Sequence, residues 1–402
     1  MFVTSPTWQM NGVNVFAMNL VRGLGTLGYN ASIVLTDPQR REFIPLQRPS
    51  DLSFTELAVD TSDSVVQRWK ALIRVLNMNR PCVYIPNYDW HTSCVASHLD
   101  NHIAIIGIVH SDDPRHYEHF ERMGNTWNAV VTVSKAIGDR VSATKPSISD
   151  RLAVIPIGVE TSGPHRRLRN NDGHLRLLYA GLLKQFQKRV LDVPEILRET
   201  ISRGTKVSLT FAGGGDDEST LREVSQEYEA QGIVRFLGIL NRERLSEEFD
   251  NHDVLLMTSE FEGLPNVLLE AMAHSLVPVV SAVTSGIPEV IRNGKNGFIV
   301  PIGDISAFAD RIQALDHDRT KLSDMASNAF ATIQNGPFRA DRMVEAYARV
   351  IDRVSIEAKE GSFERPRGRI IPPPDLNLSW RHYIPKPVRN LLRRTRGLVR
   401  DD

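Results

Sequence analysis

The sequence contains little cysteine, no excess of charge of either sign and no long apolar run. With only Cys82 and Cys94 among 402 residues, a disulfide scaffold and a multi-cysteine metal site are excluded, and two thiols fit a reducing cytosol. Lys and Arg number 48, as do Asp and Glu, so no overall positive field is available to bind nucleic acid. The longest apolar stretches, such as 103–109, are much shorter than the ~20 residues of a membrane-spanning helix. These absences predict a cytoplasmic protein that is soluble or attaches to a membrane only peripherally.

Several motifs of common enzyme classes are missing as well. The N-terminus lacks the basic and apolar regions of a signal peptide, although whether Met1 is the true start stays open. There is no Walker A sequence and no Gly-x-Ser-x-Gly elbow, so P-loop kinase and serine hydrolase functions lack support. The histidines and cysteines do not have the spacing of a zinc site. Glycines 213–215 follow an apolar run without completing a Gly-x-Gly-x-x-Gly dinucleotide motif.

What the sequence does contain is a regular alternation of short apolar runs and amphipathic segments. The expected strands are 32–35, 83–85, 103–109, 129–133 and 153–155 in the first half, and 175–179, 206–211, 234–236, 254–257, 277–280 and 298–300 in the second. Helical patterns lie between them, for example at 13–27 and 65–77. In the second of these, one face collects Val65, Trp69, Leu72, Ile73 and Leu76. Strands that alternate with helices predict an α/β fold with parallel sheets.

The alternation is interrupted once, at 160–174, where Gly, Pro, Asn and charged residues replace the apolar pattern. A chain of 402 residues is also too long for one ordinary core. We therefore predict two doubly wound, Rossmann-like domains that face each other across a cleft. The predicted boundaries are an acceptor-side domain at 1–160, a linker at 161–174, a donor-side domain at 175–336, a helix at 337–360 and a tail at 361–402. Ligands in such sheets bind at the carboxyl ends of the strands, which places the site in the cleft.

The segment 259–301 carries the most informative candidate site. Pro265 suits the first turn of a helix, and the residues just before it offer no capping side chain. The amides of Asn266, Val267 and Leu268 would then face the cleft with the positive end of the helix dipole. Such a helix start is an anion site, and phosphate is its common occupant.

Two carboxylates, Glu262 and Glu270, lie eight residues apart around this helix start. Carboxylates are poor ligands for phosphate but suit hydroxyl groups, and a sugar nucleotide has hydroxyls at both ends of its diphosphate. The alternative is that Glu270 is a solvated helix residue and Glu262 an ordinary loop charge.

Other polar and glycine residues follow predicted strands. Lys184, Lys188 and Arg189 could clamp a diphosphate, or be solvated charges at a helix start. Gly12 could let the backbone approach a phosphate from the other domain, and Gly213 lies in a turn that could line the nucleotide pocket.

His110 directly follows the run 103–109 and should project from the sheet edge into the cleft. There it could bind a sugar hydroxyl or assist proton transfer. The alternative is a histidine that is satisfied locally by Ser111 or Asp112.

An ordered set of motifs gives these candidates a family. The central one is Glu262-Gly-Leu-Pro-Asn-Val-Leu-Leu-Glu270-Ala-Met-Ala, a Glu-x(7)-Glu motif. It continues with Gly286-Ile-Pro-Glu289 and Asn293-Gly-Lys-Asn-Gly297-Phe, and is preceded by Asn11-Gly12-Val13, Val109-His110-Ser111, Val133-Ser134 and Ile155-Pro156-Ile157-Gly158-Val159. Over about residues 1–358 the sequence resembles the retaining glycosyltransferases of family 4, which have the GT-B fold.

The resemblance implies roles for the matching residues. Glu270 would hold the nucleotide ribose, Glu262 the hydroxyls of the donor sugar, and His110 the sugar near its reacting carbon. Lys188, with the amides near Gly12 and residues 264–267, would neutralise the leaving diphosphate, so no metal or other cofactor is expected. The predicted catalytic residues are Glu262, His110 and Lys188, and the predicted donor-binding residues are Gly12, Gly181, Arg189, Gly213, Leu264, Pro265, Asn266, Val267 and Glu270. The terminal helix of this fold crosses back to the first domain.

The function that the resemblance implies is transfer of a sugar from a UDP- or GDP-linked donor to a glycan or lipid-linked acceptor, with retention of anomeric configuration. Cell-surface polysaccharide or glycolipid synthesis is the expected context. One residue departs from the family pattern: Leu182 replaces the usual arginine after Gly181, so Lys184 or Arg189 would have to substitute. Two alternatives stay open, a GT-B sugar-nucleotide epimerase and a catalytically degenerate protein that only binds nucleotide sugars.

The tail differs in charge from the rest of the chain. From Gly361 it holds ten basic and four acidic residues, a formal charge of +6, so the remainder carries −6. In 386–400, Val388, Leu391 and Leu392 are interleaved with basic residues, a pattern that suits an anionic membrane surface on the inner face of the membrane. A disordered, solvated tail is the alternative, and nucleic acid is disfavoured because the acidic body would repel it.

Overall fold

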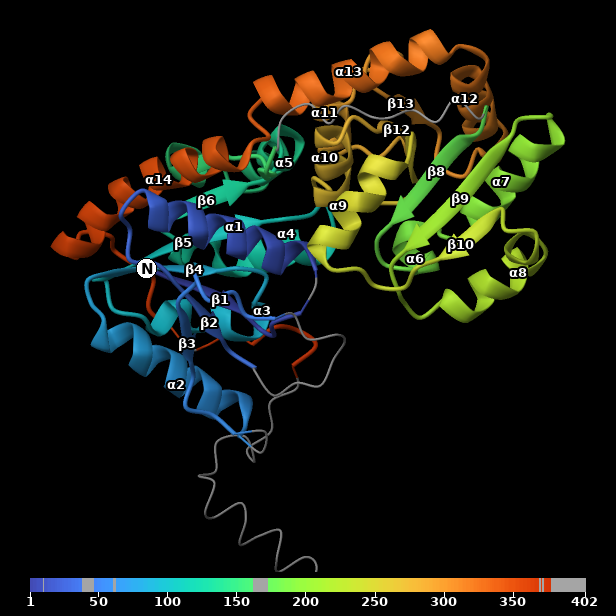
Figure 1. The fold of residues 1–402 in the computed structure, drawn as a ribbon. Helices are drawn as coiled ribbons and strands as arrows, with labels where there is room; N and C mark the ends of the chain where they lie inside the picture. The colour runs from blue at the N-terminus through green and yellow to red at the C-terminus, as the bar shows by residue number, and fades with distance from the viewer. Residues whose placement is uncertain are drawn as a thin grey trace, which may run out of the picture.

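Two parallel β-sheets, one per domain, form the framework of the molecule (Figure 1). The computed structural model describes residues 1–9, 11–37, 47–60, 63–161, 173–368, 370 and 372–376. The N-terminal sheet has seven strands in the order β3-β2-β1-β4-β5-β6-β7, and the C-terminal sheet has six in the order β10-β9-β8-β11-β12-β13. Helices separate most consecutive strands in both domains, so the predicted α/β fold with two doubly wound domains is confirmed.

The strands of the N-terminal sheet are β1 (Phe2–Ser5), β2 (Ser32–Leu35), β3 (Phe54–Glu56), β4 (Cys82–Pro86), β5 (Ile103–Val109), β6 (Ala129–Thr132) and β7 (Leu152–Val154). Those of the C-terminal sheet are β8 (Leu175–Ala180), β9 (Val207–Ala212), β10 (Val234–Phe236), β11 (Val254–Met257), β12 (Val277–Ser281) and β13 (Phe298–Val300). All seven residues of β5 are buried, as expected for a strand that helices cover on both faces. The short edge strand β3 was not predicted, because its three residues are partly or fully exposed and show no apolar run.

The helices of the first half are α1 (Gly12–Thr26), α2 (Val65–Met78), α3 (Trp90–Ser93), α4 (Pro114–Met123) and α5 (Lys135–Thr144), with short 3-10 turns at Cys94–His98, Gly124–Thr126 and Pro146–Arg151. Those of the second half are α6 (Gln185–Lys188), α7 (Asp192–Ser202), α8 (Glu218–Ala230), α9 (Arg242–Asn251), α10 (Asn266–Ala273), α11 (Ile287–Val290), α12 (Ile305–His317), α13 (Arg319–Asn335) and α14 (Ala340–Glu360). On α2 the predicted face is buried at Trp69, Leu72 and Leu76, whereas Val66 is buried in place of Val65.

The last long helix, α14, packs against the N-terminal domain although it follows the C-terminal one (Figure 1). It lies along α1, where the ring of Tyr347 is 5.6 Å from that of Phe16. The two helices approach so closely that a Cβ on Gly23 would stand 2.4 Å from a methyl carbon of Val344. The hydroxyl of Tyr29 also donates to Asp352 at 2.7 Å. This helix therefore ties the end of the second domain to the first.

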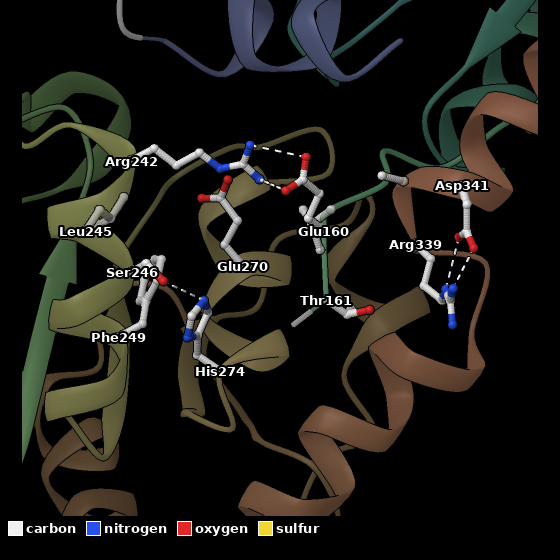
Figure 2. A pocket seen from close by; sticks show the side chains of 12 residues that line it. Glu160, Thr161, Arg242, Leu245, Ser246, Phe249, Glu270, His274, Arg339 and Asp341 are labelled. Carbon is white, nitrogen blue, oxygen red and sulfur yellow. Dashed lines mark hydrogen bonds and ion pairs between the residues drawn. The ribbon is translucent and has the colours of Figure 1, made fainter. Parts of the chain in front are cut away.

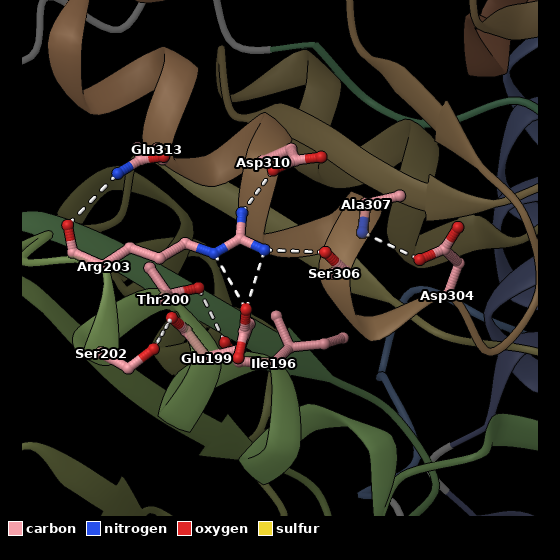
Figure 3. A network of polar contacts seen from close by, with 10 residues as sticks. All are labelled: Ile196, Glu199, Thr200, Ser202, Arg203, Asp304, Ser306, Ala307, Asp310 and Gln313. Carbon is pink, nitrogen blue, oxygen red and sulfur yellow. Dashed lines mark hydrogen bonds and ion pairs between the residues drawn. The ribbon is translucent and has the colours of Figure 1, made fainter.

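Within the C-terminal domain, one arginine fastens α7 to α12 (Figure 3). The guanidinium of Arg203 pairs with Glu199 at 2.8 Å and donates to Ser306 Oγ at 2.8 Å, and it also pairs with Asp310. The Arg203 side chain is only 20% exposed, so its polar contacts are partly shielded from water and are stronger than they would be on the surface. The network thereby holds together the outer helices of the domain that carries the predicted donor site.

The described part of the tail is anchored by one buried arginine. The guanidinium of Arg365, a residue that is 5% exposed, donates at 2.6–3.1 Å to the carbonyls of Leu99, Asp100, Ile103 and Thr126 and to Asn128 Oδ1. Burial lowers the pKa of this guanidinium to about 10. The tail thus begins as a fixed part of the N-terminal domain.

We predict that Arg365→Ala lowers the free energy of unfolding by about 2–4 kcal/mol, because it leaves several buried carbonyls without donors. Urea denaturation measures the change, and Arg367→Ala, at an exposed position two residues on, is the matched control. A loss below about 0.5 kcal/mol in the Arg365 variant, the size of an ordinary surface substitution, contradicts the anchoring role.

Two of the predicted segments lie outside the described residues: most of the linker, at 162–172, and the basic segment 386–400. Residues 38–46 lie outside them as well. Among the helices in the described ranges, none combines the length and apolar character needed to cross a membrane.

Candidate active site

One contact between the carboxyl ends of the two sheets joins the loops after β5 and β11. Ser111, just after β5, forms an antiparallel bridge with Gly263 after β11, and the amide of Asp112 donates to the carbonyl of Glu262 at 3.4 Å. The approach requires glycine, because a Cβ on Gly263 would lie 2.0 Å from the carbonyl oxygen of His110. This contact brings the predicted residues His110 and Glu262 onto adjoining segments.

Lys188 and Glu262 form an ion pair beside this contact. Lys188 Nζ lies 2.5 Å from Glu262 Oε1, and Ser259 Oγ donates to the same oxygen at 2.6 Å. The side chains are only 18% and 7% exposed, so the pair lies in a region of low dielectric where charge interactions are strong. Two of the predicted catalytic residues are therefore in direct contact, Lys188 at the end of α6 after β8 and Glu262 in the loop after β11.

His110 is held as a neutral ring. Asn87 Nδ2 donates to the carbonyl of Val13 at 3.2 Å, which turns its Oδ1 toward His110 Nε2 at 2.8 Å. Since this oxygen only accepts, Nε2 carries the proton and Nδ1 is left as an acceptor. Burial lowers the pKa of His110 to about 4, so the ring is uncharged at neutral pH. The local partner is Asn87, whereas the sequence suggested Ser111 or Asp112.

The start of α10 lies against the start of α1. Asn266 Nδ2 donates to the carbonyl of Gly12 at 3.0 Å, so these two predicted donor-binding residues touch across the domains. The helix begins at Asn266, one residue later than predicted, because Pro265 has an extended ψ of 123° and is the N-cap. The amide of Leu268 bonds to the carbonyl of Pro265, which corrects the expectation that it is free.

The amides of Asn266 and Val267 keep the orientation of a helix N-terminus, where no intrahelical acceptor exists. The side chain of Leu264 is buried at 4% exposure and packs in the core. Of the predicted donor-binding residues 264–267, the backbone amides of 266 and 267 are therefore the groups available to an anion.

Glu270 lies one turn further along α10, in the wall of a cavity of about 400 Å³ (Figure 2). The cavity is bounded by α9, α10, the segment 159–161 and the start of α14, at the junction of the two domains. Above the carboxylate, Arg242 on α9 pairs with Glu160 at 3.1 Å (Figure 2). Among the described residues, no donor lies within hydrogen-bond distance of the Glu270 carboxylate. Burial raises the pKa of Glu270 to about 7, with Arg242 opposing the rise and Glu160 adding to it.

A carboxyl group in a cavity without an internal partner is suited to binding a ligand. If it accepts hydrogen bonds from ribose hydroxyls as a carboxylate, binding should tighten as the group ionises. Because the pKa is raised, the proton is held up to about pH 7 and lost above it.

We therefore predict that the Kd for the matching nucleotide-sugar donor falls about tenfold from pH 6 to pH 8. Calorimetric titration of a diphosphate diester such as UDP-glucose or GDP-mannose avoids ionisation of a terminal phosphate in this range. The Glu270→Gln variant should bind more weakly and with no such pH dependence. An equal slope in wild type and variant assigns the effect to another group.

The remaining predicted residues are placed less directly. Gly181 and Gly213 have φ values of 147° and 155°, and a Cβ on Gly213 would lie 1.8 Å from the carbonyl oxygen of Gly181. Their observed role is this close approach of the ends of β8 and β9. The guanidinium of Arg189 is directed to Asp192 at 2.8 Å and Glu260 at 3.2 Å. Two carboxylates therefore hold it, and its predicted contact with the donor stays untested.

The loop after β8 also contains the departure from the family pattern. Leu182 is 41% exposed, and its carbonyl accepts from the hydroxyl of Tyr179 at 2.8 Å. Lys184 lies 3.6 Å from Asp216. Neither Lys184 nor Arg189 joins the Lys188–Glu262 pair. Of the three predicted cations, Lys188 is therefore the one that contacts Glu262.

Sequence reasoning missed the residues that hold the predicted ones. Asn87 orients His110, Ser259 contacts Glu262, and Arg242 with Glu160 covers Glu270. Asn87 could have been found by the rule that selected His110, because each is a polar residue just beyond a buried strand. No three His, Cys, Asp or Glu side chains in the described ranges gather as metal ligands, and independence from metal stays a prediction.

Comparisons with known proteins agree with this arrangement. The family model for Glycosyltransferase Family 4 matches residues 10–162, and that for Glycosyl transferases group 1 matches residues 165–332. A relative named as a colanic acid biosynthesis glycosyltransferase, WcaL of Salmonella typhimurium, is 32% identical over 180 residues, 42% of this chain and 44% of that protein. The lipopolysaccharide core biosynthesis glycosyltransferase LpsE of Rhizobium meliloti is 31% identical over 155 residues, 39% of this chain and 44% of that protein. These matches thus span less than half the length of either relative.

Among solved structures, Anabaena HepE in complex with UDP and glucose has a TM-score of 0.68 at 15% identity. The superposition covers 87% of this chain and 99% of HepE, which establishes the shared fold. The two adjoining family models, the relatives and the paired parallel sheets together place this chain in glycosyltransferase family 4, with the GT-B fold.

Proposed function

We propose that the chain is a retaining glycosyltransferase that moves a sugar from a UDP- or GDP-linked donor to a glycan or lipid-linked acceptor. The observation that carries the proposal is the Lys188–Glu262 ion pair, which is nearly buried and lies against the His110 segment of the other domain. A cation at this point is suited to the negative charge that develops on a leaving diphosphate. Relatives named for colanic acid and lipopolysaccharide core biosynthesis support cell-surface polysaccharide or glycolipid synthesis as the context.

The described residues divide the work as follows. Glu270 accepts hydrogen bonds from the ribose, while Lys188 and the amides of Asn266 and Val267 face the diphosphate. Glu262 Oε2, the oxygen not engaged by Ser259 and Lys188, accepts from a hydroxyl of the donor sugar. On the opposite domain, the unprotonated His110 Nδ1 is a hydrogen-bond acceptor for the donor sugar.

In the transfer step, the acceptor hydroxyl attacks the anomeric carbon on the face from which the nucleotide departs. The new carbon–oxygen bond forms as the bond to the diphosphate oxygen breaks, and the hydroxyl proton passes to the diphosphate. Lys188 stabilises the charge on that group without a resident metal. Departure and attack on one face retain the anomeric configuration.

The test of this proposal is an assay of nucleotide release and product configuration with a panel of UDP- and GDP-sugars. Membranes or surface-glycan fractions serve as acceptor source, and proton NMR of the purified product reads the anomeric coupling. A glycoside with the configuration of its donor supports the proposal. An inverted product contradicts retention, and formation of an epimerised sugar nucleotide without acceptor contradicts transfer altogether.

We further propose that the basic segment 386–400 binds anionic lipid on the cytoplasmic face of a membrane. Support comes from the start of the tail, where Asp375 pairs with His91 of α3 at 3.0 Å and Arg365 is buried in the N-terminal domain.

In sedimentation with vesicles, the full chain should pellet with 30% phosphatidylglycerol and not with phosphatidylcholine alone. Changing Arg389, Arg393, Arg394 and Arg396 to glutamine should reduce the bound fraction at least fivefold, since each basic residue contributes about 1 kcal/mol. Unchanged pelleting of this variant contradicts the assignment.

A further inference from the structure

An aromatic residue with an unusual backbone conformation stands next to the reacting groups. Tyr88 has a φ of +53°, in the left-handed region that a bulky side chain rarely adopts. Such a conformation is strained and persists only where the surroundings impose it. Its ring is also 37% exposed, so burial in a core does not account for its position.

The neighbours of Tyr88 fix this conformation from both sides. Asn87 is held by Val13 and His110, as described above. On the other side, the buried carboxyl of Asp89 accepts from Thr36 Oγ1 at 2.6 Å and from the amide of Thr92. The strained residue lies between two anchored ones, which set the direction of its Cα–Cβ bond.

The ring of Tyr88 contacts three other rings, one of which is His110. Its centroid is 5.1 Å from that of Trp90 and 5.0 Å from that of His116, and 6.3 Å from that of His110. We call Tyr88, Trp90 and His116 the aromatic platform. His116 is buried and Trp90 is half-buried, so these two rings support Tyr88, whose exposed part is a rigid apolar surface beside a polar site.

A cation lies at the edge of this platform. The guanidinium of Arg115 is 5.6 Å from the ring centroid of Trp90 and pairs with Asp113 at 2.6 Å. Its side chain is 63% exposed, so donors remain available to a ligand. An exposed aromatic face with hydrogen-bond donors at its rim matches the chemistry of a pyranose, which has an apolar face of C–H groups and a rim of hydroxyls.

We propose that the aromatic platform is the subsite for a pyranose ring of the acceptor, with Tyr88 stacking on its C–H face and Arg115 binding its hydroxyls. The ring centroid of Tyr88 lies 6.3 Å from that of His110, so a pyranose on the exposed part of Tyr88 lies beside the His110 segment that meets the Glu262 loop. Tyr88 is thus a specificity-determining residue for the acceptor. The inference rests on the proposed glycosyl transfer.

The test is saturation-transfer NMR on the full chain with methyl pyranosides of glucose, galactose, mannose and N-acetylglucosamine, in the presence of UDP or GDP. We expect saturation transfer to the ring C–H protons of at least one pyranoside. The signal should fall at least fivefold in Tyr88→Ala and stay within twofold of wild type in Tyr88→Phe. Tyr88→Gly removes the ring while relieving the strained backbone, so it separates loss of stacking from loss of folding.

Phe186→Ala is the matched control, because Phe186 is a 75% exposed aromatic side chain on the other domain. It should leave the pyranoside signal within twofold of wild type. Two outcomes overturn the acceptor subsite alone, provided that the wild type binds UDP or GDP. One is a full pyranoside signal in both Tyr88→Ala and Tyr88→Gly, and the other is no signal from the wild type with any pyranoside. Failure of the wild type to bind UDP or GDP instead overturns the proposed function.

Discussion

Replacing Lys188 with alanine is expected to lower kcat for sugar transfer by about 10²–10³-fold, the largest effect that we predict for a single side chain. Lys188 Nζ lies 2.5 Å from Glu262 and is only 18% exposed, so its charge acts in a largely dry environment. Without it, the leaving diphosphate loses a preorganised cation, and of the two described side-chain partners of the buried Glu262 carboxylate the hydroxyl of Ser259 remains. Steady-state rates of nucleotide release measure the change.

Two variants separate the role of this charge from general damage. Lys188→Arg retains the cation at a different geometry and should recover part of the rate. Lys206→Ala removes an exposed lysine before β9, at the opposite end of the sheet, and should stay within twofold of wild type. A folded Lys188→Ala enzyme with the wild-type kcat is incompatible with the assigned role.

The second large effect is expected for Gly263→Ala, with a loss of about 10²-fold in kcat. The new Cβ would stand 2.0 Å from the carbonyl oxygen of His110, and a backbone atom cannot rotate away as a flexible side chain can. The loop that carries Glu262 must therefore move off the His110 segment, and displacement by about 1 Å costs a rate of this size. The donor Kd should change less than kcat, because Glu270 lies outside the contact.

Gly25→Ala provides the comparison for this variant. A Cβ on Gly25 would meet no atom within 4 Å, and this helical position should tolerate alanine with unchanged or slightly higher stability. If Gly263→Ala retains the wild-type kcat in the same assay, the meeting of the two loops is not part of the catalytic arrangement.

The strand pattern was predictable because burial leaves a direct trace in the sequence. β5 and β11 coincide with apolar runs since helices cover both faces of each sheet. The edge strand β3 left no such trace, because a strand with exposed residues needs no apolar pattern. The long helix α14 was predicted at 337–360 and its return to the first domain came from the resemblance alone, whereas its packing on α1 was found only in the structure.

The candidate site was predictable as a set of residues and much less as a geometry. Lys188 and Glu262 are 74 residues apart, and only the parallel order of β8 and β11 places the loops after them side by side. No spacing rule distinguishes Lys188 from Arg189, although the left-handed φ of Arg189 directs that side chain toward Asp192 and Glu260. Tyr88 was not predicted, because its positive φ is a property of the folded backbone that the sequence does not reveal.

The most direct test of the account is a thermal-shift screen of the full chain against UDP, GDP, ADP and their sugars, with Glu270→Gln measured in parallel. A ligand at a hundred times its Kd stabilises the folded state by about 2.7 kcal/mol, which gives a readily measured shift. The account predicts selective stabilisation by one nucleotide and its sugars, reduced in the variant. A folded chain that none of these ligands stabilises would contradict the assignment of a nucleotide-sugar glycosyltransferase.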